Sequence, residues 1–322
     1  MKLVFFGTGP FGIPTLEALK KSSHRILSVV SSSDKPQGRQ RELQSSPVKE
    51  WAVRHNIPVF DAVDLNSLSS LRHLQDFGAE LWVVIDFGII LTRALLEIPN
   101  FALNVHSSLL PRHRGAAPVV WALLSGDTQT GVTVMRMTEK LDAGDILIQK
   151  KEPIFPDENV VSLEKKLQAL GAEALLEGIE KLEKGNPVFL PQDESKASYA
   201  RKLKKADGAI DWKRPASQIV NQVRALLEWP GSYCFYKGKR LIVLDVGAPP
   251  RGCPGRAQGP APTADIMVSP GTILKASPKE GLWVAAADGV LEIRQLQAEG
   301  KNPLPAKEFL KGFPLAEGQV LE

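Results

Sequence analysis

Short apolar runs alternate with amphipathic segments through the first half of the chain. The apolar runs read LVFF, ILSVVSS, IPVF, LWVVID and FALNVH, and segments with helical spacing, such as PTLEALKKS and LSSLRHLQDF, lie between them. A repeated order of strand, helix and strand is typical of a parallel sheet covered by helices. The pattern therefore predicts an α/β fold with a Rossmann-like parallel sheet.

A hairpin and a long helix are predicted next. GVTVMRM and ILIQKKEPI alternate apolar and polar positions, which predicts two strands with Asp142 near the turn between them. The segment from Ser162 has helical spacing, and its apolar side carries Leu163, Leu167, Leu170 and Leu182. We expect this stripe to pack against the sheet.

The pattern changes again near Leu203, after a tract that is polar and then basic. ASQIVNQVRALLEW predicts a helix, and SYCFYK, KRLIVLDV, GTILKAS, GLWVAAA and GVLEIRQLQ predict short strands separated by turn residues. Such strands are typical of a small, mostly antiparallel, OB-like β-barrel. We therefore predict two domains, 1–203 and 204–322, and a Pro/Gly-rich loop between strands over 248–269.

Composition agrees with this division and adds weak limits. A chain of 322 residues exceeds the usual size of a single core. The formal net charge of +4 permits nucleic-acid binding without requiring it. Two cysteines, Cys234 and Cys253, provide neither a disulfide framework nor a metal-ligand set. With no signal-peptide, transit or membrane-spanning pattern, the expected location is the cytoplasm.

The candidate chemistry lies in Asn104, His106 and Asp142. Alternate residues of a strand point the same way, and FALNVH would place the first two near its carboxyl end, where open α/β sheets bind ligands. An amide can stabilise an oxyanion, an imidazole exchanges protons near neutrality, and a carboxylate can fix the imidazole tautomer and favour its protonated form. These roles predict acyl transfer to an amine. For an isolated Asn-x-His, however, two polar side chains satisfied within a loop are the favoured interpretation.

The surrounding sequence changes that balance. NVHSSLLPRHRGAAP and EKLDAGDIL resemble the folate-dependent formyltransferases, and so do VFFGTG, SPVKEWA, GDTQTGVTVMRM, SYARKLKKADGAIDW and PGTILKA, so that the resemblance covers nearly the whole chain. It is closest to the members that formylate the α-amine of methionyl-initiator-tRNA. The resemblance implies that 10-formyltetrahydrofolate is the donor, that Asn104, His106 and Asp142 are catalytic, and that no metal is needed. We expect a monomer.

The resemblance also implies a folate site. The SLLP segment would lie against the folate, and the loop after the fourth strand would hold the pterin largely through backbone groups. The residues concerned are Ser108, Leu109, Leu110, Pro111, Gly88 and Ile90. Asp86 and Phe87 stand where the family more often has a small residue and Tyr. A hydroxyl is lost and an acid gained by these two departures, while backbone contacts to the pterin would survive both.

A tRNA surface is implied by the same resemblance. The early polar segment resembles the basic insertion with which the family holds the acceptor end of the tRNA, with Arg39 and Arg41 in place and Glu42 where another basic residue is usual. Arginine suits this task because its planar fork binds phosphate bidentately. A second basic cluster lies at the predicted boundary and includes Lys202, Lys204 and Lys205. A third contains Lys237, Lys239 and Arg240.

The string GTGPFG from Gly7 matches the dinucleotide-binding pattern GxGxxG and follows a predicted strand. Pro10 lacks the N–H that a phosphate cradle needs, and the next strand ends in serines where an acid should hold a ribose. We therefore interpret these glycines as a tight turn from strand into helix.

Two alternatives remain open. A 10-formyltetrahydrofolate hydrolase has the same fold, carries a string like SLLPRHRGA and is slightly better matched by His113, but the hydrolase module of the related dehydrogenase lacks an equivalent of Asn104 and of the early basic loop. The other alternative is a catalytically idle RNA-binding protein. The intact Asn, His and Asp argue against it.

Overall fold

The computed structural model describes residues 1–37, 42–247 and 268–322. These residues form two compact units. The first contains 1–118, 128–155 and 162–201, and the second contains 119–127, 156–161 and 202–322. The main division thus falls between Arg201 and Lys202, and two short segments from earlier in the chain belong to the second unit.

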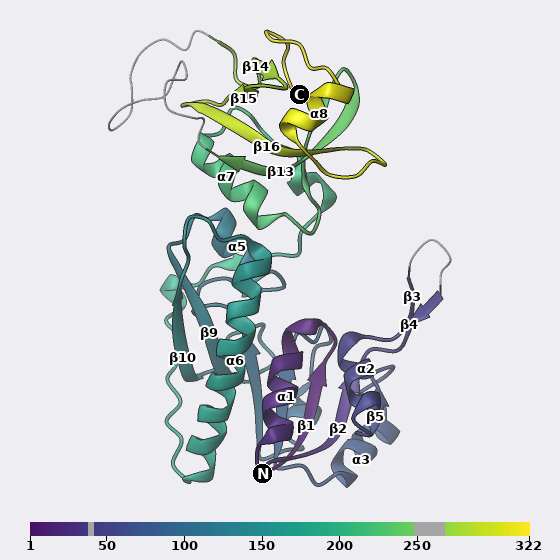
Figure 1. Ribbon diagram of the computed structural model, residues 1–322. Coiled ribbons are helices and arrows are strands. Elements are labelled where there is room, and N and C mark those ends of the chain that lie inside the picture. Colours follow the sequence, from purple (N-terminus) through teal and green to yellow (C-terminus); the bar gives the residue numbers. More distant parts are fainter. Residues whose placement is uncertain (38–41, 248–267) are drawn as a thin grey trace. The chain divides into compact units, whose positions relative to one another are not determined.

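The first unit is built on a seven-stranded sheet with the order β10-β9-β7-β6-β1-β2-β5 (Figure 1). The strands β7, β6, β1, β2 and β5 are paired in parallel in that order. By contrast, β9 pairs antiparallel with both β7 and β10. The predicted parallel sheet and the hairpin after it are therefore confirmed. The strands are β1 (Lys2–Gly7), β2 (Arg25–Ser31), β5 (Val59–Asp61), β6 (Leu81–Ile85), β7 (Phe101–His106), β9 (Gln129–Arg136) and β10 (Ile146–Pro153).

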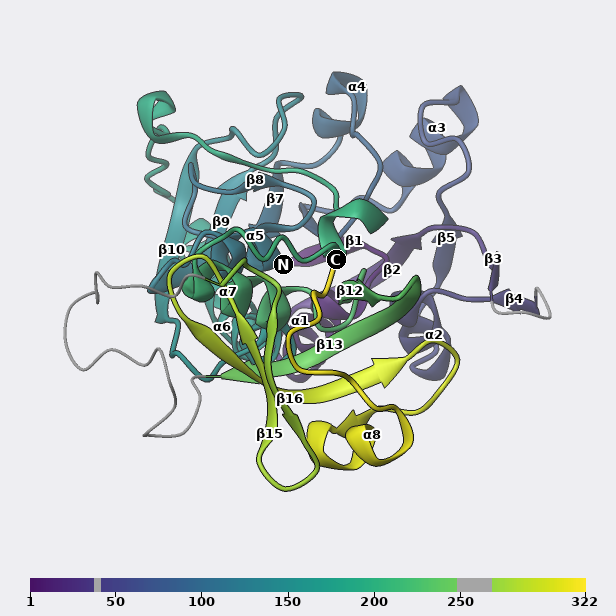
Figure 2. The same ribbon diagram turned by 90° about the horizontal axis from the view of Figure 1, so that it is seen from above.

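Helices cover both faces of this sheet, as Figure 2 shows. On one face, Leu74 of α3 and Leu95 of α4 pack with sheet residues such as Phe6 and Trp82. The opposite face carries α1, α2 and α6, and there Val105 of β7 lies against Gly171 of α6. These helices are α1 (Ile13–Lys21), α2 (Pro47–Arg54), α3 (Leu68–Asp76), α4 (Arg93–Leu96) and α6 (Val160–Glu183). All of α5 (Pro118–Leu124) except its first residue belongs to the second unit.

The polar segment after β2 is partly ordered as strands. Residues of β3 (Lys35–Gln37) pair antiparallel with β4 (Glu42–Gln44). The two ends of this polar segment therefore pair with each other. The predicted tRNA residues Arg39 and Arg41 lie outside the described residues, as do residues 248–267 of the loop predicted over 248–269.

The glycines of GTGPFG are required by close packing. A Cβ at Gly7 would stand 2.7 Å from Phe5 Cε1 and 2.9 Å from the Ile85 carbonyl oxygen, and one at Gly12 would stand 2.8 Å from Phe5 Cζ. Gly9 and Gly12 have negative φ values of −80° and −78°. Their backbone angles are therefore open to other residues. Glycine is required here because a side chain would collide with neighbouring atoms.

The second unit contains an antiparallel sheet with the order β12-β13-β16-β15-β14, and β17 pairs with β16. The prediction that the second domain is built on antiparallel strands is confirmed. Its core gathers apolar side chains from the sheet and from α7 and α8. The elements are α7 (Ala216–Ala225), β12 (Ser232–Tyr236), β13 (Lys239–Gly247), β14 (Ile273–Ser277), β15 (Gly281–Ala285), β16 (Val290–Ala298), β17 (Leu304–Pro305) and α8 (Ala306–Gly312).

Two helices of this unit differ from expectation. The α7 helix was predicted to reach Trp229 but ends at Ala225, and Trp229 is half-exposed. Pro230 disfavours helical backbone at the residue before it, which helps to explain the early end. The short α8 helix was not predicted. Among the described helices, none is both long and apolar enough to cross a membrane.

Candidate active site

Asn104 and His106 reach the same face of the sheet because they alternate along β7. Ala102, two residues before Asn104, belongs to the buried cluster on the face of α3 and α4, while Val105 faces α6. His106 is buried, with 6% of its surface exposed. The strand therefore delivers an amide and an imidazole side by side near the carboxyl end of β7.

Asp142 is brought to this pair by the turn between β9 and β10. The β9 register places Arg136 opposite Leu103, and the next residue, Met137, donates its N–H to the Ala102 carbonyl at 2.8 Å. The turn must then fold back to reach the end of β7. There Asp142 Oδ1 accepts a hydrogen bond from Asn104 Nδ2 at 3.4 Å, and Oδ2 lies 3.8 Å from His106 Nδ1. The structure thus brings all three predicted catalytic side chains together.

The two nitrogens of the His106 ring have different partners. Nε2 lies 2.9 Å from the carbonyl oxygen of His113, which can only accept a hydrogen bond. Nε2 therefore carries a hydrogen, and proton exchange during a reaction is confined to Nδ1. The short hydrogen bond of Asp142 Oδ2 comes from the Gly115 N–H at 2.7 Å. In this structure the His113 carbonyl, and not Asp142 as expected from the sequence, sets the imidazole tautomer.

The Asn104 amide can still serve a substrate. Its Nδ2 carries two hydrogens. One faces Asp142, and the other has no protein acceptor within the described parts of the chain. A donor held in this way beside an imidazole can stabilise an oxyanion on a reacting carbonyl group.

Hydrogen bonds to residues outside the segment hold the predicted folate segment Ser108–Pro111. Ser108 is fully buried and its hydroxyl donates to the Arg112 carbonyl at 2.6 Å. The Leu110 N–H donates to Thr133 Oγ1 at 3.1 Å, and the side chain of Leu110 is buried as well. Only Leu109 and Pro111 in this segment are half-buried side chains. The Ser108 and Leu110 side chains therefore shape the segment from inside.

Thr133 and Gln149 support this segment and were missed from the sequence. Thr133 Oγ1 donates to the Ser108 carbonyl at 2.7 Å, and Gln149 Nε2 donates to the Leu110 carbonyl at 2.9 Å. Thr133 is fully buried. A polar residue in the apolar run of GVTVMRM was the one signal that could have indicated its role.

The loop after β6 presents its other predicted folate residues to the surface. Gly88 has open space around it, and Ile90 is 75% exposed. Phe87 is turned into the core, with its ring centroid 5.6 Å from that of Phe6. Asp86 has a φ of +49°, and its carboxylate lies against the backbone of Gly9. Although part of Asp86 remains exposed, desolvation raises the pKa of this carboxyl group.

The predicted tRNA lysines Lys202, Lys204 and Lys205 open the second unit and are all exposed. The Lys204 backbone N–H donates to Asp207 Oδ2 at 2.7 Å, which fixes the short turn that carries these side chains. Exposed lysines on a fixed turn can contact phosphates.

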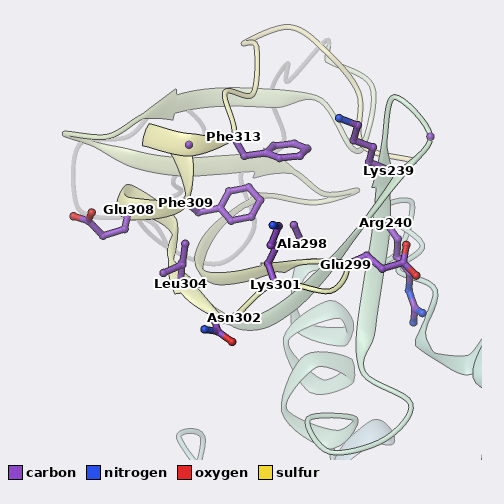
Figure 3. A pocket seen from close by; sticks show the side chains of 12 residues that line it. Lys239, Arg240, Ala298, Glu299, Lys301, Asn302, Leu304, Glu308, Phe309 and Phe313 are labelled. Atoms are coloured by element: carbon purple, nitrogen blue, oxygen red, sulfur yellow. The ribbon is translucent and has the colours of Figure 1, made fainter. Parts of the chain in front are cut away.

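The third basic cluster borders a pocket of about 760 Å³, shown in Figure 3. The Lys239 ammonium lies 5.6 Å from the centroid of the Phe313 ring. Carboxylates also line the pocket, so its charge is mixed. The lining residues are Gly238, Lys239, Arg240, Ala298, Glu299, Lys301, Asn302, Leu304, Glu308, Phe309, Gly312 and Phe313.

Two family models match the chain. The model described as formyl transferase covers residues 1–179, and the model described as formyl transferase, C-terminal domain, covers residues 202–314. The first match contains Asn104, His106 and Asp142, and the second contains all strands of the antiparallel sheet. Fold and site together define a formyl transferase.

Curated relatives narrow this class. The methionyl-tRNA formyltransferase of Geotalea uraniireducens is 40% identical over 322 residues, which cover 100% of this chain and 98% of the relative. That of a Sulfurihydrogenibium species is 36% identical and covers 100% of both chains. The chain belongs to the methionyl-tRNA formyltransferase family.

Solved structures share the fold at lower identity. HypX from Aquifex aeolicus, in complex with tetrahydrofolic acid, aligns with a TM-score of 0.64 and 17% identity over 100% of this chain and 50% of that chain. The N-formyltransferase of Helicobacter canadensis, in complex with folinic acid and dTDP-3-aminofucose, aligns with a TM-score of 0.63 and 16% identity over 92% and 99%. At these identities the likeness supports the fold alone.

Proposed function

We propose that this chain transfers the formyl group of 10-formyltetrahydrofolate to the α-amine of methionyl-initiator-tRNA, and that Asn104, His106 and Asp142 carry the reaction. The observation that carries the proposal is the convergence of Asn104 Nδ2 and His106 Nδ1 on the Asp142 carboxylate, at 3.4 and 3.8 Å. It occurs in a chain that aligns over its whole length with methionyl-tRNA formyltransferases. Donor and acceptor are both substrates in this reaction.

Asn104 and His106 stabilise the charge that develops during transfer. The amine attacks the formyl carbon, a new C–N bond forms, and the bond from that carbon to N10 of the folate breaks. The formyl oxygen gains negative charge in between, and the second N–H of Asn104 and a protonated His106 Nδ1 donate to it. Asp142 compensates the positive charge of the imidazolium.

Protons must leave the attacking nitrogen and reach N10. His106 Nδ1 is the ring atom able to exchange a proton, because Nε2 is held by the His113 carbonyl. An α-amine has an ordinary pKa of about 7.7 to 8.0, so a fraction is neutral and nucleophilic at neutral pH. No group of three or more His, Cys, Asp or Glu side chains is placed to hold a metal ion within the described ranges.

The folate site is assigned to Ser108, Leu109, Leu110, Pro111, Gly88 and Ile90. The exposed Ile90 side chain and the open space at Gly88 fit a flat aromatic ligand held by backbone groups. Within the rigid SLLP segment, Leu109 and Pro111 offer apolar contact, while Ser108 and Leu110 maintain its conformation.

The residues proposed to contact phosphates of the initiator tRNA are Arg39, Arg41, Lys202, Lys204 and Lys205. We propose residues 1–203 as the catalytic domain and 204–322 as the tRNA-binding domain. The enzyme acts as a monomer in the cytoplasm, where charged tRNA is used for protein synthesis.

Product analysis with purified protein tests the acceptor. The protein is incubated with 10-formyltetrahydrofolate and charged initiator methionyl-tRNA, and formyl-methionyl-tRNA is measured alongside tetrahydrofolate. A parallel reaction omits the tRNA. We expect both products to form in equal amounts only when charged tRNA is present. Equal release of tetrahydrofolate without tRNA would make water the acceptor and the chain a hydrolase.

A further inference from the structure

One segment of the first unit contacts both partners of the His106 ring. We call residues 192–200 the strap; its end, β11 (Tyr199–Ala200), pairs in parallel with β8 (Arg114–Gly115). Gln192, at the other end, reaches the turn that carries Asp142. Ser198 Oγ accepts a hydrogen bond from the His113 N–H at 2.9 Å, and the carbonyl of His113 faces His106 Nε2.

The orientation of the Gln192 amide is fixed by a buried arginine. Arg114 is 2% exposed, and its Nε and Nη2 donate to Gln192 Oε1 at 3.1 and 2.8 Å. A guanidinium has no acceptor, so the amide oxygen must face Arg114. The amide nitrogen is then directed at the turn, where it donates to the carbonyls of Asp142 at 2.9 Å and Gly144 at 2.7 Å.

Arg114 is itself held by a carboxylate. Its Nη1 and Nη2 donate to the two carboxylate oxygens of Glu194 at 2.9 and 2.8 Å. This pairing raises the pKa of Arg114, so the buried guanidinium keeps its charge and its donors. A bidentate pair also fixes the plane of the guanidinium. Glu194, Arg114, Gln192 and the Asp142 turn therefore form one continuous chain of hydrogen bonds.

The turn needs such support. Asp142 has a φ of +47°, a left-handed backbone conformation that is unfavourable for a non-glycine residue. The residue before it, Leu141, is 62% exposed and contributes little packing. Yet the Asp142 carboxylate must stay within reach of both Asn104 and His106.

We propose that Gln192 is a positioning residue for Asp142, oriented by Arg114, and that this contact sets the rate of formyl transfer. The inference rests on the proposed function of Asp142. In this proposal the strap, which contains none of the three catalytic residues, holds the catalytic carboxylate in place.

Gln192→Glu is the sharpest variant. It keeps the side-chain size and the contact with Arg114 but replaces the donor by an oxygen that repels the carbonyls of Asp142 and Gly144. We expect kcat to fall by about tenfold or more, since small misplacements of a catalytic group cost up to about 100-fold, while KM for both substrates stays within about twofold. Gln75→Glu, an exposed position on α3 with the same change of charge, should leave kcat unchanged. Unchanged kcat in Gln192→Glu would overturn the proposal.

A double-mutant cycle separates positioning from general damage to the fold. In single-turnover reactions with excess enzyme, Gln192→Glu should slow an Asp142→Asn enzyme by less than about threefold, because residues that act as one unit are not additive. An equal loss in both backgrounds would overturn the positioning role. If the Asp142→Asn enzyme keeps the full wild-type rate, the proposed function of Asp142 is refuted. If Asp142→Asn is slow but Gln192→Glu keeps the full rate, only the positioning role of Gln192 is refuted.

Discussion

At the scale of single residues, His106 shows how one side chain is divided between structure and chemistry. Nε2 is hydrogen-bonded to the His113 carbonyl at 2.9 Å, and Nδ1 faces the Asp142 carboxylate at 3.8 Å. A backbone carbonyl can only accept a hydrogen bond, so Nε2 keeps its hydrogen and Nδ1 is the nitrogen left for chemistry. Protonation of Nδ1 places a new donor beside Asn104 Nδ2, where an oxyanion would form.

Asp86 provides a pH-dependent prediction for stability. Desolvation raises its pKa in the folded protein, so the folded state binds this proton more tightly than the unfolded state, where the pKa is about 3.9. The free energy of unfolding therefore falls as pH rises above about 4, and the loss is complete above the folded pKa. Asp86→Asn removes this loss.

Urea denaturation at pH 7 and below pH 4 checks this. The variant should have the larger free energy of unfolding at pH 7, and the difference should shrink in acid. A wild-type protein that is more stable than Asp86→Asn at pH 7 would show that the carboxylate stabilises the fold.

At the scale of elements, the short pairing between β8 and β11 shapes the candidate site. Gly115 has a φ of +121°, and a Cβ there would stand 2.6 Å from the carbonyl oxygen of Ala200. Its N–H is also the short hydrogen-bond donor to Asp142 Oδ2. A single position thus joins the strap to the catalytic carboxylate.

Gly115→Ala should therefore affect stability and rate together. We expect a decrease of about 2–4 kcal/mol in the free energy of unfolding, from backbone strain plus the close contact, and a lower kcat. Gly78→Ala is the matched control, because Gly78 has a φ of +58° but no atom within 4 Å of the new Cβ. It should cost about 1 kcal/mol, from strain alone. Equal costs at both positions would show that Ala200 yields without penalty.

Elements with a strong hydrophobic period could be predicted from the sequence. Four of the five parallel strands (β1, β2, β6 and β7), α6 and the hairpin of β9 and β10 each bury several apolar side chains. By contrast, β8 and β11 are two-residue strands defined by a pairing 85 residues apart, and no local pattern indicates it. The short α8 helix was missed for a related reason, because seven residues carry too few apolar repeats.

The candidate site divides in the same way. Asn104, His106 and Asp142 were predicted because their side chains suit the chemistry and their surroundings resemble a known family. Arg114, Gln192 and Thr133 act through hydrogen bonds to groups that are distant in the sequence, so only the folded chain reveals them. The role of the His113 carbonyl was likewise hidden, because a backbone oxygen leaves no trace in the sequence.

At the scale of the whole molecule, the proposal is that one domain catalyses the reaction and the other binds the tRNA, which is a large substrate. The chain carries a formal net charge of only +4, so tRNA affinity must come from local clusters of basic residues. Lys202, Lys204 and Lys205 form such a cluster at the start of the second unit. Phosphate contacts of this kind make binding strongly dependent on salt.

Replacing these three lysines by alanine should raise KM for the tRNA by about tenfold near physiological salt and reduce the slope of log affinity against log salt by up to about three. KM for the folate should not change. A triple variant of Lys20, Lys21 and Lys184, which are exposed lysines of the first unit, removes the same charge and should leave the slope unchanged. Equal slopes in wild type and the first variant would exclude this cluster from the tRNA surface.

The most direct measurement is the single-turnover rate of formyl transfer to methionyl-initiator-tRNA by Asn104→Ala, compared with wild type and with Asn100→Ala, an exposed asparagine shortly before the same strand. If Asn104 donates to the oxyanion, its variant should be slower by on the order of 100-fold or more with an unchanged fold by circular dichroism, and Asn100→Ala should match wild type. A rate for Asn104→Ala within about threefold of wild type would contradict the assignment of the catalytic site.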